Sequence, residues 1–364
     1  MLDLLGILVG VALGSGCGDD GSIGALGSSD ESTGASTAGP ASADSTTGDP
    51  DTGVLDETGP VGTSGTTSDS TGETESETDP GPMLDCSMLA EGTVSGFMVE
   101  GMAREFILNL PAGVEDGGPW PVVFNWHGLS DNAADMSTLV APHVDNAVMP
   151  FIAVTPEDTD YMLEVPIPGL PPMDWEVFAV DPTDNRELAL FDAVLACIDE
   201  RWGVDPDHVH SMGFSLGGIL TDMLASYRSD VLASVATYSG GYWNNPDNVD
   251  AFLANVVMWP EYAVDEGYTQ LLLHGGPDDL IDFFIAQMRF DQYAESDSLF
   301  LGERGHDTIV CDHGLGHSAP PPQMQADRLI EFFADHPFGT VDSPYVDGLP
   351  GSFADYCEFR GKAG

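Results

Sequence analysis

Two kinds of hydrophobic pattern alternate along most of this 364-residue chain. Short apolar runs bounded by turn residues predict buried β-strands, and they fall at residues 103–110, 121–126, 151–154, 209–214, 231–238, 269–273 and 308–310. Longer segments with apolar residues every three or four positions predict helices, at residues 131–148 (with Ser130 as N-cap), 186–202, 216–227, 280–293 and 324–336. Strands that alternate with helices predict the α/β class, with a mostly parallel sheet covered by helices on both faces.

The composition divides the chain into parts. Every Trp, Tyr and Phe lies within residues 83–364, a length that can bury one sizeable core. Residues 18–82 are almost entirely Gly, Ser, Thr, Asp, Glu, Pro and Ala, and such a segment cannot bury enough apolar surface to offset the entropy of ordering it. We therefore expect a disordered acidic tether over residues 18–82 and one folded domain over residues 83–364.

Residues 1–17 predict an export signal. The apolar run from Leu4 to Leu13 is too short to span a bilayer as a helix, and small residues precede Cys17. This segment resembles a bacterial lipoprotein signal, in which the cysteine becomes the lipid-modified amino terminus, although it carries no basic residue and has Gly14 where such signals usually have a branched aliphatic residue. The expected location is extracellular or in the cell envelope, with membrane attachment only through lipid on Cys17.

The charge is strongly one-sided. With 61 acidic and 9 basic residues, the formal net charge is -52. Such a surface repels nucleic acids and anionic membranes, so neither is an expected partner. The charge is typical of a protein that works in a salty medium, where counter-ions screen the repulsion; the alternative is a general aid to solubility.

One short motif indicates catalysis. The segment Gly213-Phe214-Ser215-Leu216-Gly217 stands between a predicted strand and a predicted helix. A sharp turn in that setting exposes a serine hydroxyl beside a base, and only small neighbours fit around it. Ser215 is therefore the candidate nucleophile, although a Gly-rich turn with an idle serine has the same sequence.

An acid and a histidine follow in the order expected of an α/β-hydrolase. Asp278 and Asp279 follow the predicted strand at 269–273, and His317 lies beyond the strand at 308–310. Asp278 is the preferred acid, with Asp279 as its rival and a helix cap as the role of the other. His317 is the preferred base, with the alternatives His306 and His313.

Two backbone N–H groups are candidates for the oxyanion hole. Leu216 opens the helix behind the serine, and Leu129 follows a central strand. Gly128 is the alternative to Leu129, and His127 is expected to brace this loop as a buried histidine. Nearby aromatic residues could line an apolar cleft, although core packing explains each one equally well: Trp126, Trp175, Tyr242, Trp243 and Trp259.

Four cysteines besides Cys17 predict two disulfides in an exported domain. They are Cys86, Cys197, Cys311 and Cys357, and three pairings are open. A bridge between Cys86 and Cys357 would join the two ends of the domain, and a bridge at Cys311 would stiffen the loop that carries His317. No Cys-x-x-Cys spacing occurs, and no metal or cofactor is predicted.

Several segments together resemble a known family. They are His127-Gly128, Gly213 to Gly218, His274 to Asp278, Gly316 to Pro320, and Phe332 to Pro337. They look like secreted α/β-hydrolases of the polyhydroxybutyrate depolymerase, feruloyl esterase and acetyl xylan esterase group. The resemblance covers roughly residues 95–340 and implies a serine carboxylester hydrolase with the triad Ser215, Asp278 and His317.

The implied substrate is a feruloyl or acetyl polysaccharide ester, or a polyhydroxyalkanoate-type polyester. Two alternatives remain at this point. One is a serine peptidase of the prolyl-oligopeptidase type, which shares the fold. The other is a surface binding protein that has lost catalysis.

Overall fold

The computed structural model describes residues 84–159, 173–177, 182–248, 259, 267–283, 286–318 and 327–362. The chain divides into two compact units, Met1–Glu75 and Ser76–Gly364, and every described residue belongs to the second. The predicted signal segment (residues 1–17) and acidic tether (residues 18–82) lie outside the described residues. Within the described part of the chain, no helix is long and apolar enough to cross a bilayer.

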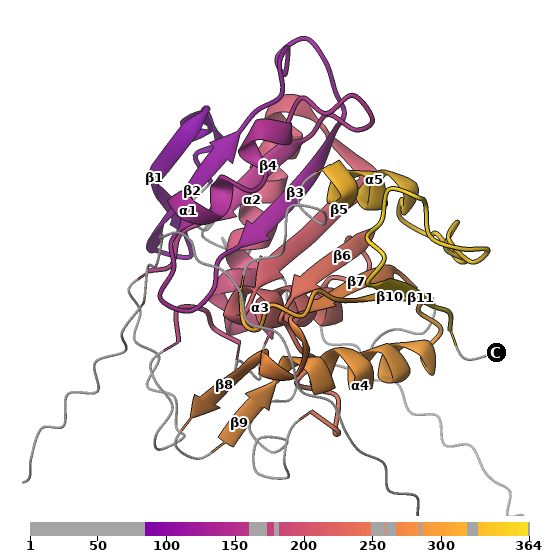
Figure 1. Cartoon of the computed structure of the whole chain (residues 1–364). Helices are drawn as coiled ribbons and strands as arrows, with labels where there is room; N and C mark the ends of the chain where they lie inside the picture. Colours follow the sequence, from indigo (N-terminus) through magenta and orange to yellow (C-terminus); the bar gives the residue numbers. More distant parts are fainter. Residues whose placement is uncertain are drawn as a thin grey trace, which may run out of the picture. The chain divides into compact units, whose positions relative to one another are not determined.

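A nine-stranded sheet forms the centre of this unit (Figure 1). Its order is β1-β2-β4-β3-β5-β6-β7-β10-β11. The neighbours from β4 to β10 all pair in parallel, and antiparallel pairs occur only toward the two edges. The strands are β1 (Gly92–Val99), β2 (Met102–Asn109), β3 (Trp120–Trp126), β4 (Ile152–Pro156), β5 (Val204–Phe214), β6 (Ser234–Tyr238), β7 (Thr269–His274), β10 (Thr308–Asp312) and β11 (Cys357–Arg360).

Helices cover both faces of the sheet, which confirms the predicted α/β class. The larger core packs under α2 (Arg186–Trp202), α3 (Leu216–Tyr227) and α4 (Phe290–Gly302). A second core on the other face packs under α1 (Ala133–Ser137) and α5 (Asp327–Asp335). Because parallel strands are buried on both faces, β4, β6 and β7 carry continuous buried runs rather than an alternating pattern.

Helix α2 has the bounds that its sequence predicts. The Asn185 side chain accepts hydrogen bonds from the N–H groups of Glu187 and Leu188, which caps the start of the helix. Gly203 follows the last turn with a φ of 78°, a conformation that glycine adopts without strain. Local capping and the 3.6-residue period therefore predict the bounds of this helix, and its apolar face packs in the larger core.

Two other helix predictions are wrong in their extent. The segment 131–148 forms only α1 and the 3₁₀ turn Ala141–His143, and the N-cap is Asn132 rather than Ser130. Ser130 has a φ of 62° and therefore cannot act as an extended cap residue.

The segment 280–293 begins as an antiparallel hairpin rather than as a helix. Its strands are β8 (Leu280–Phe283) and β9 (Ala286–Arg289), and α4 starts only at Phe290. Periodicity alone does not distinguish a strand from a helix in such a short apolar run.

Two disulfides occur in the described chain, as the sequence predicts, and their pairing is now fixed. Cys86 bonds to Cys197 on α2, and Cys311 at the end of β10 bonds to Cys357 on β11. The bridge between Cys86 and Cys357, which would have joined the two ends of the domain, does not form.

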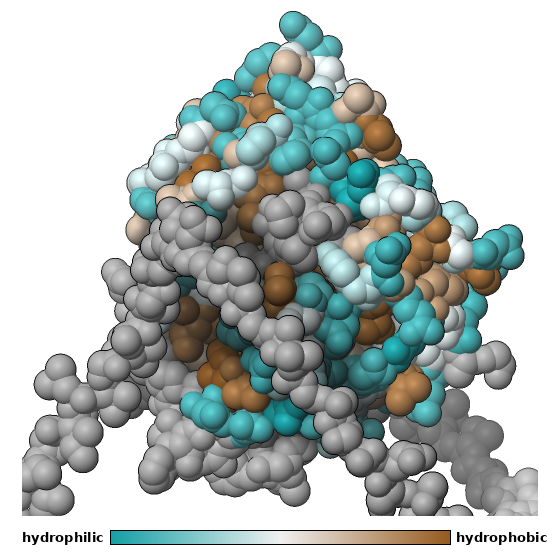
Figure 2. Space-filling view, viewed as in Figure 1, coloured by the Kyte–Doolittle hydropathy of each residue, from teal (hydrophilic) through white to brown (hydrophobic). Residues whose placement is uncertain are grey.

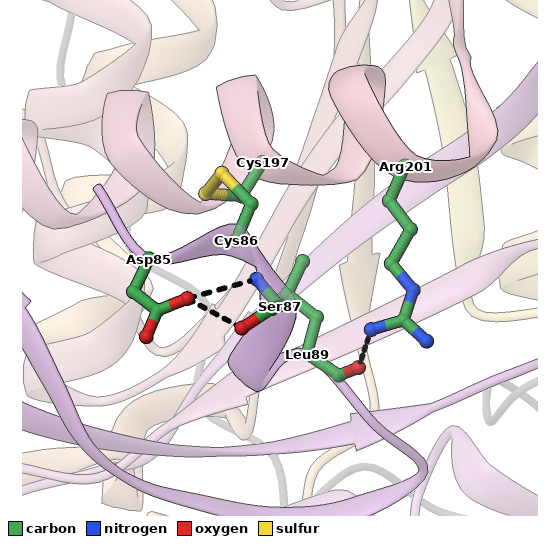
Figure 3. Close-up of a disulfide and its surroundings, with 6 residues drawn as sticks. All are labelled: Asp85, Cys86, Ser87, Leu89, Cys197 and Arg201. Atoms are coloured by element: carbon green, nitrogen blue, oxygen red, sulfur yellow. Dashed lines mark hydrogen bonds between the residues drawn. A yellow bond between two sulfur atoms is a disulfide. The ribbon is translucent and has the colours of Figure 1, made fainter. Parts of the chain in front are cut away.

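The first bridge fastens the start of the described chain to α2 (Figure 3). Asp85 caps the 3₁₀ turn Cys86–Met88 through the N–H of Ser87. The guanidinium of Arg201, one turn along α2 from Cys197, donates to the carbonyl of Leu89. The segment is thus held to α2 by a covalent bond and by a hydrogen bond.

Candidate active site

Ser215 occupies a sharp turn between β5 and α3. Its backbone has φ 56° and ψ −119°, an unfavourable conformation for a residue with a side chain. Its N–H donates to the carbonyl of Tyr238 at 2.8 Å, which holds the turn to the neighbouring strand. The strained turn raises the side chain out of the sheet at the carboxyl end of a central strand.

The two glycines of the motif are required by close packing. A Cβ on Gly213 would lie 2.1 Å from the carbonyl oxygen of Gly217, and a Cβ on Gly217 would lie 2.2 Å from that of Trp126. Neither backbone atom can move away cheaply, so α3 and β3 can approach the turn only if both positions lack side chains.

The structure brings His317 to Ser215. The Nε2 atom of His317 lies 3.0 Å from the Ser215 hydroxyl oxygen. The imidazole stacks between the rings of Phe214 and Phe290, at centroid distances of 5.0 and 4.9 Å. Two flanking aromatic rings restrict the tilt of the imidazole and leave its two nitrogen atoms free for hydrogen bonds.

Asp279, rather than Asp278, is the acid that reaches His317. Its Oδ1 accepts from Nδ1 of His317 at 2.7 Å, and its side chain is fully buried. Asp278 is exposed and ends the 3₁₀ turn Gly276–Asp278. The preference for Asp278 is therefore wrong, because this short turn directs adjacent carboxylates to opposite sides.

Asp279 is held as an anion by its neighbours. Burial alone would raise the pKa of Asp279, but hydrogen bonds from His317, the Gly275 N–H and the Ser239 hydroxyl outweigh that cost and leave its pKa below the usual value. An ionised Asp279 requires Nδ1 of His317 to carry a proton. In the neutral imidazole, Nε2 is then the acceptor that faces Ser215.

The other two candidate histidines lie elsewhere. His306 is buried and its Nδ1 contacts the backbone of Tyr268, while Nδ1 of His313 accepts from the N–H of Leu315. His313 also donates its backbone N–H to the carbonyl of His274, which links the loops after β10 and β7. Both histidines thus have structural contacts of their own.

The predicted oxyanion loop lies against the serine. A Cβ on Gly128 would be 3.3 Å from Cβ of Ser215. The loop is fixed on both sides of Gly128, since Trp175 donates its indole N–H to the carbonyl of His127 at 2.9 Å and Asp174 accepts from the N–H of Ser130. Leu129 and Leu216 border the same small pocket as Ser215.

This pocket is almost entirely apolar. Its lining residues come from the oxyanion loop, the serine turn and α3, the β8–β9 hairpin, the start of α4, and the segments around Met173 and Trp243. They are Leu129, Met173, Ser215, Leu216, Ile219, Trp243, Ile281, Met288 and Phe290. In Figure 2 a few hydrophobic residues lie beside hydrophilic ones on the part of the surface where Figure 1 places β8 and β9. Of the aromatic residues expected at a cleft, Trp243 borders the pocket and stacks on Trp259, while Trp126, Trp175 and Tyr242 are buried in the core.

Sequence reasoning missed three kinds of contributor to this site. Ser239, which binds Asp279, has a φ of 53° at the end of β6, and the Ser239-Gly240-Gly241 turn was the available signal. Ile281 and Met288 fall within the predicted helix over residues 280–293, whereas in the structure they lie on the β8–β9 hairpin. Met173 lies in a loop-rich segment without a periodic pattern.

Comparison with known proteins agrees with this architecture. No protein-family model matches the chain. Feruloyl esterase D of Neurospora crassa is 25% identical over 144 residues, which cover 39% of this chain and 47% of that protein. The chain therefore spans about half the length of this curated relative.

Solved structures show the fold over a longer range. The crystal structures of native sOPH and native pOPH have TM-scores of 0.60 and 0.58 at 18% identity. They cover 76% and 75% of this chain, and 96% and 95% of their own chains. The chain has the α/β-hydrolase fold, and the curated protein that it resembles in sequence is a feruloyl esterase.

Proposed function

We propose that this protein is a serine carboxylester hydrolase that works through an acyl-enzyme. The observation that carries the proposal is the continuous chain of hydrogen bonds from Ser215 through His317 to Asp279, at 3.0 and 2.7 Å. The similarity to a feruloyl esterase supports the same activity.

Each group has a role that follows from its surroundings. His317 Nε2 accepts the Ser215 proton as the oxygen attacks the ester carbonyl, and Asp279 stabilises the imidazolium that forms. The N–H groups of Leu216 and Leu129 bind the oxyanion, aided by the positive end of the α3 dipole. His317 then protonates the leaving alcohol, and the same histidine activates the water that releases the acid.

The apolar pocket beside Ser215 supports binding of the acyl part of the substrate. Its lining by Leu129, Trp243 and the hairpin residues favours an aryl or alkyl acyl group over a charged one. We infer that the substrate is a feruloyl or acetyl ester of a polysaccharide, or a polyester of the polyhydroxyalkanoate type. No cofactor enters any step of this mechanism.

A serine-directed organophosphonate tests the chemistry. We expect it to label Ser215 in the folded protein, and Ser215→Ala to abolish both labelling and turnover of short acyl esters. Intact mass spectrometry after incubation reports the label, and circular dichroism verifies that the variant is folded. Absence of labelling in folded wild-type protein would exclude the mechanism.

Ester and peptide substrates compared side by side test the reaction class. Faster turnover of peptides than of matched esters would favour the peptidase alternative. A screen of acetyl esters, feruloylated sugars and polyhydroxybutyrate films then identifies the acyl group.

We further propose that the domain functions outside the cytoplasm. Its two disulfides are typical of oxidising compartments. Lipid attachment at Cys17 is a separate proposal, since it rests on the sequence signal alone. Metabolic labelling with a clickable fatty acid tests it, and Cys17→Ala should remove the label without changing activity.

A further inference from the structure

A second group of polar side chains lies at the same edge of the sheet as the catalytic residues. His127 directly follows β3, and Glu157 and Asp158 directly follow β4. Because β3 and β4 are parallel neighbours, their carboxyl ends meet at one edge. Three potential metal ligands, from two segments that lie apart in the sequence, are thus brought together beside the oxyanion loop.

His127 has one nitrogen atom without an evident role. The ring is fully buried, and its Nδ1 donates to the carbonyl of Gly128 at 2.8 Å, since a carbonyl oxygen can only accept. Its Nε2 is buried and has no hydrogen-bond partner in the described part of the chain. A buried polar atom without a hydrogen-bond partner calls for an explanation, and a bound ion is one of the recognised ones.

The Nε2 atom of His127 lies near the carboxylates of Glu157 and Asp158. Oε1 of Glu157 lies 3.7 Å from Nε2 of His127, while Oε2 of Glu157 is already used by the N–H of Ala133 at 2.9 Å. One carboxylate oxygen of Glu157, one of Asp158 and Nε2 of His127 all lie within 4.8 Å of one another.

A third carboxylate, that of Asp174, is close to this group and accepts a hydrogen bond from the N–H of Ser130. Three carboxylates therefore lie around the imidazole of His127, and a cation bound among them would be attracted by their negative charges.

We propose that His127, Glu157 and Asp158 bind one divalent transition-metal ion, with Zn²⁺ as the first candidate and Mn²⁺ as the second. One imidazole and two carboxylates suit these ions, whereas Ca²⁺ and Mg²⁺ prefer oxygen ligands alone. Zinc binds such atoms at about 2.0–2.2 Å, which places two ligands of a tetrahedral ion about 3.3–3.6 Å apart. Nε2 of His127 and Oε1 of Glu157, at 3.7 Å, are close to that separation, and the other ligand pairs, within 4.8 Å, would approach by up to about 1.5 Å on binding. The hydrogen bond from Nδ1 to Gly128 fixes the tautomer that leaves Nε2 available to the metal.

The bound ion would have a positioning role. His127 stands next to Gly128 and two residues before Leu129, the proposed oxyanion donor. A metal ion that joins His127 to the end of β4 would fix this loop against Ser215. This consequence rests on the proposed hydrolase activity, but the binding of the ion does not.

Calorimetric titration of the chelator-treated full chain with ZnCl₂ tests the site, with MnCl₂ and CaCl₂ as further arms. High NaCl suppresses weak binding to the surface of a chain with a net charge of -52. We expect one saturable Zn²⁺ site per chain. We also expect affinity at least about tenfold lower in the double variant Glu157→Gln, Asp158→Asn, in line with the loss of two ligands.

Asp205→Asn is the matched control, because Asp205 also lies beside a histidine, His208, at 3.0 Å but outside this group. It should bind Zn²⁺ as the wild type does. Asp158→Asn alone is the second variant in case the double variant does not fold, and it too should bind more weakly. Zn²⁺ should raise the melting temperature of the wild type and of Asp205→Asn more than that of either site variant.

Two results would overturn the site: no saturable Zn²⁺ or Mn²⁺ binding by the wild type, or equal affinities in wild type and site variants. Neither result would affect phosphonate labelling of Ser215, so failure of the metal site and failure of the hydrolase are distinguishable. If both proposals hold, removal of the ion should lower kcat more than it changes KM, because Leu129 acts on the oxyanion.

Discussion

Gly275 and Gly316 touch through their backbones. A Cβ on Gly275 would lie 1.9 Å from the carbonyl oxygen of Gly316, and the N–H of Gly316 donates to the carbonyl of Gly275 at 2.8 Å. Gly275 belongs to the loop that carries Asp279, and Gly316 directly precedes His317. This contact therefore sets the distance between the acid and the base.

Gly275→Ala should separate the two loops. We expect ester turnover to fall at least about a hundredfold, because a displacement of 1 Å at a catalytic group can cost that much. The melting temperature should also fall. Gly351→Ala is the control, since a Cβ there meets nothing within 4 Å. Wild-type turnover by a folded Gly275→Ala protein would contradict the assigned role of this contact.

Replacement of Asp279 should lower kcat far more than replacement of its neighbour Asp278. Asp279→Asn removes the anion that holds His317 in its tautomer, and we expect kcat to fall about 10³–10⁴-fold, as for the acid of other serine triads. Asp278→Asn changes an exposed side chain and should leave kcat within about twofold. Steady-state kinetics on a short acyl ester measure kcat for both variants. A larger loss of kcat in Asp278→Asn than in Asp279→Asn would show that Asp278 is the acid of the triad.

Both disulfides should contribute to the free energy of unfolding, but only the Cys311–Cys357 bridge should affect turnover. Loop closures of 46 and 111 residues are worth about 4 and 5 kcal/mol in the chain-entropy model. We expect Cys86→Ser with Cys197→Ser to lower the free energy of unfolding while the native protein keeps most of its turnover. Cys311→Ser with Cys357→Ser should lower both, because β10 leads into the loop of His317.

Denaturant titration and kinetics on each folded double variant make this comparison. Equal losses of turnover in the two variants would show that the Cys311–Cys357 bridge has no particular effect on the base.

Asp297 should make stability depend on pH. Burial raises the pKa of its carboxyl to about 7, although hydrogen bonds from Asn245, the Tyr242 N–H and Asn248 act in the opposite direction. Between pH about 4 and 7 the folded state holds a proton that the unfolded state has lost. The contribution of this bound proton to the free energy of unfolding is therefore fully present at the acid end of this window, and it is lost as the pH rises toward the pKa of the folded state.

The free energy of unfolding of the wild type minus that of Asp297→Asn should consequently fall with rising pH, by at most about 1.4 kcal/mol per pH unit. Urea titrations at several pH values measure the difference. Asp116→Asn, at an exposed position, gives the effect of removing one charge. A flat difference for Asp297→Asn would show that this carboxyl titrates normally.

Salt should stabilise the folded protein. With a net charge of -52, self-repulsion opposes the compact state, and counter-ions screen it. We expect the melting temperature to rise from low to molar NaCl. Because sulfate also strengthens apolar burial, NaCl and sulfate at equal ionic strength are compared. A rise with sulfate alone would assign the effect to burial rather than to screening.

The local sequence determined those features that depend on neighbours along the chain. The turn at Ser215 follows from glycines at positions 213 and 217, and α2 follows from its period, its Asn185 cap and Gly203. The alternation of buried strands with helices predicted the parallel sheet, because such strands must be covered on both faces. Of the histidines near the last parallel strand, His317 is the predicted base because it lies furthest beyond that strand, on a loop that can reach back to the serine.

Only the tertiary structure decided between neighbours with the same local pattern. Asp278 and Asp279 differ by one position, and the direction of a short turn buries one beside His317 and exposes the other. The disulfide pairing depends on which strands and helices become adjacent. Residues 280–289 form the β8–β9 hairpin rather than the start of a helix, a choice that the periodicity of a short apolar run leaves open. His127, Glu157 and Asp158 meet because β3 and β4 pair in parallel, a contact between distant segments that no local pattern encodes.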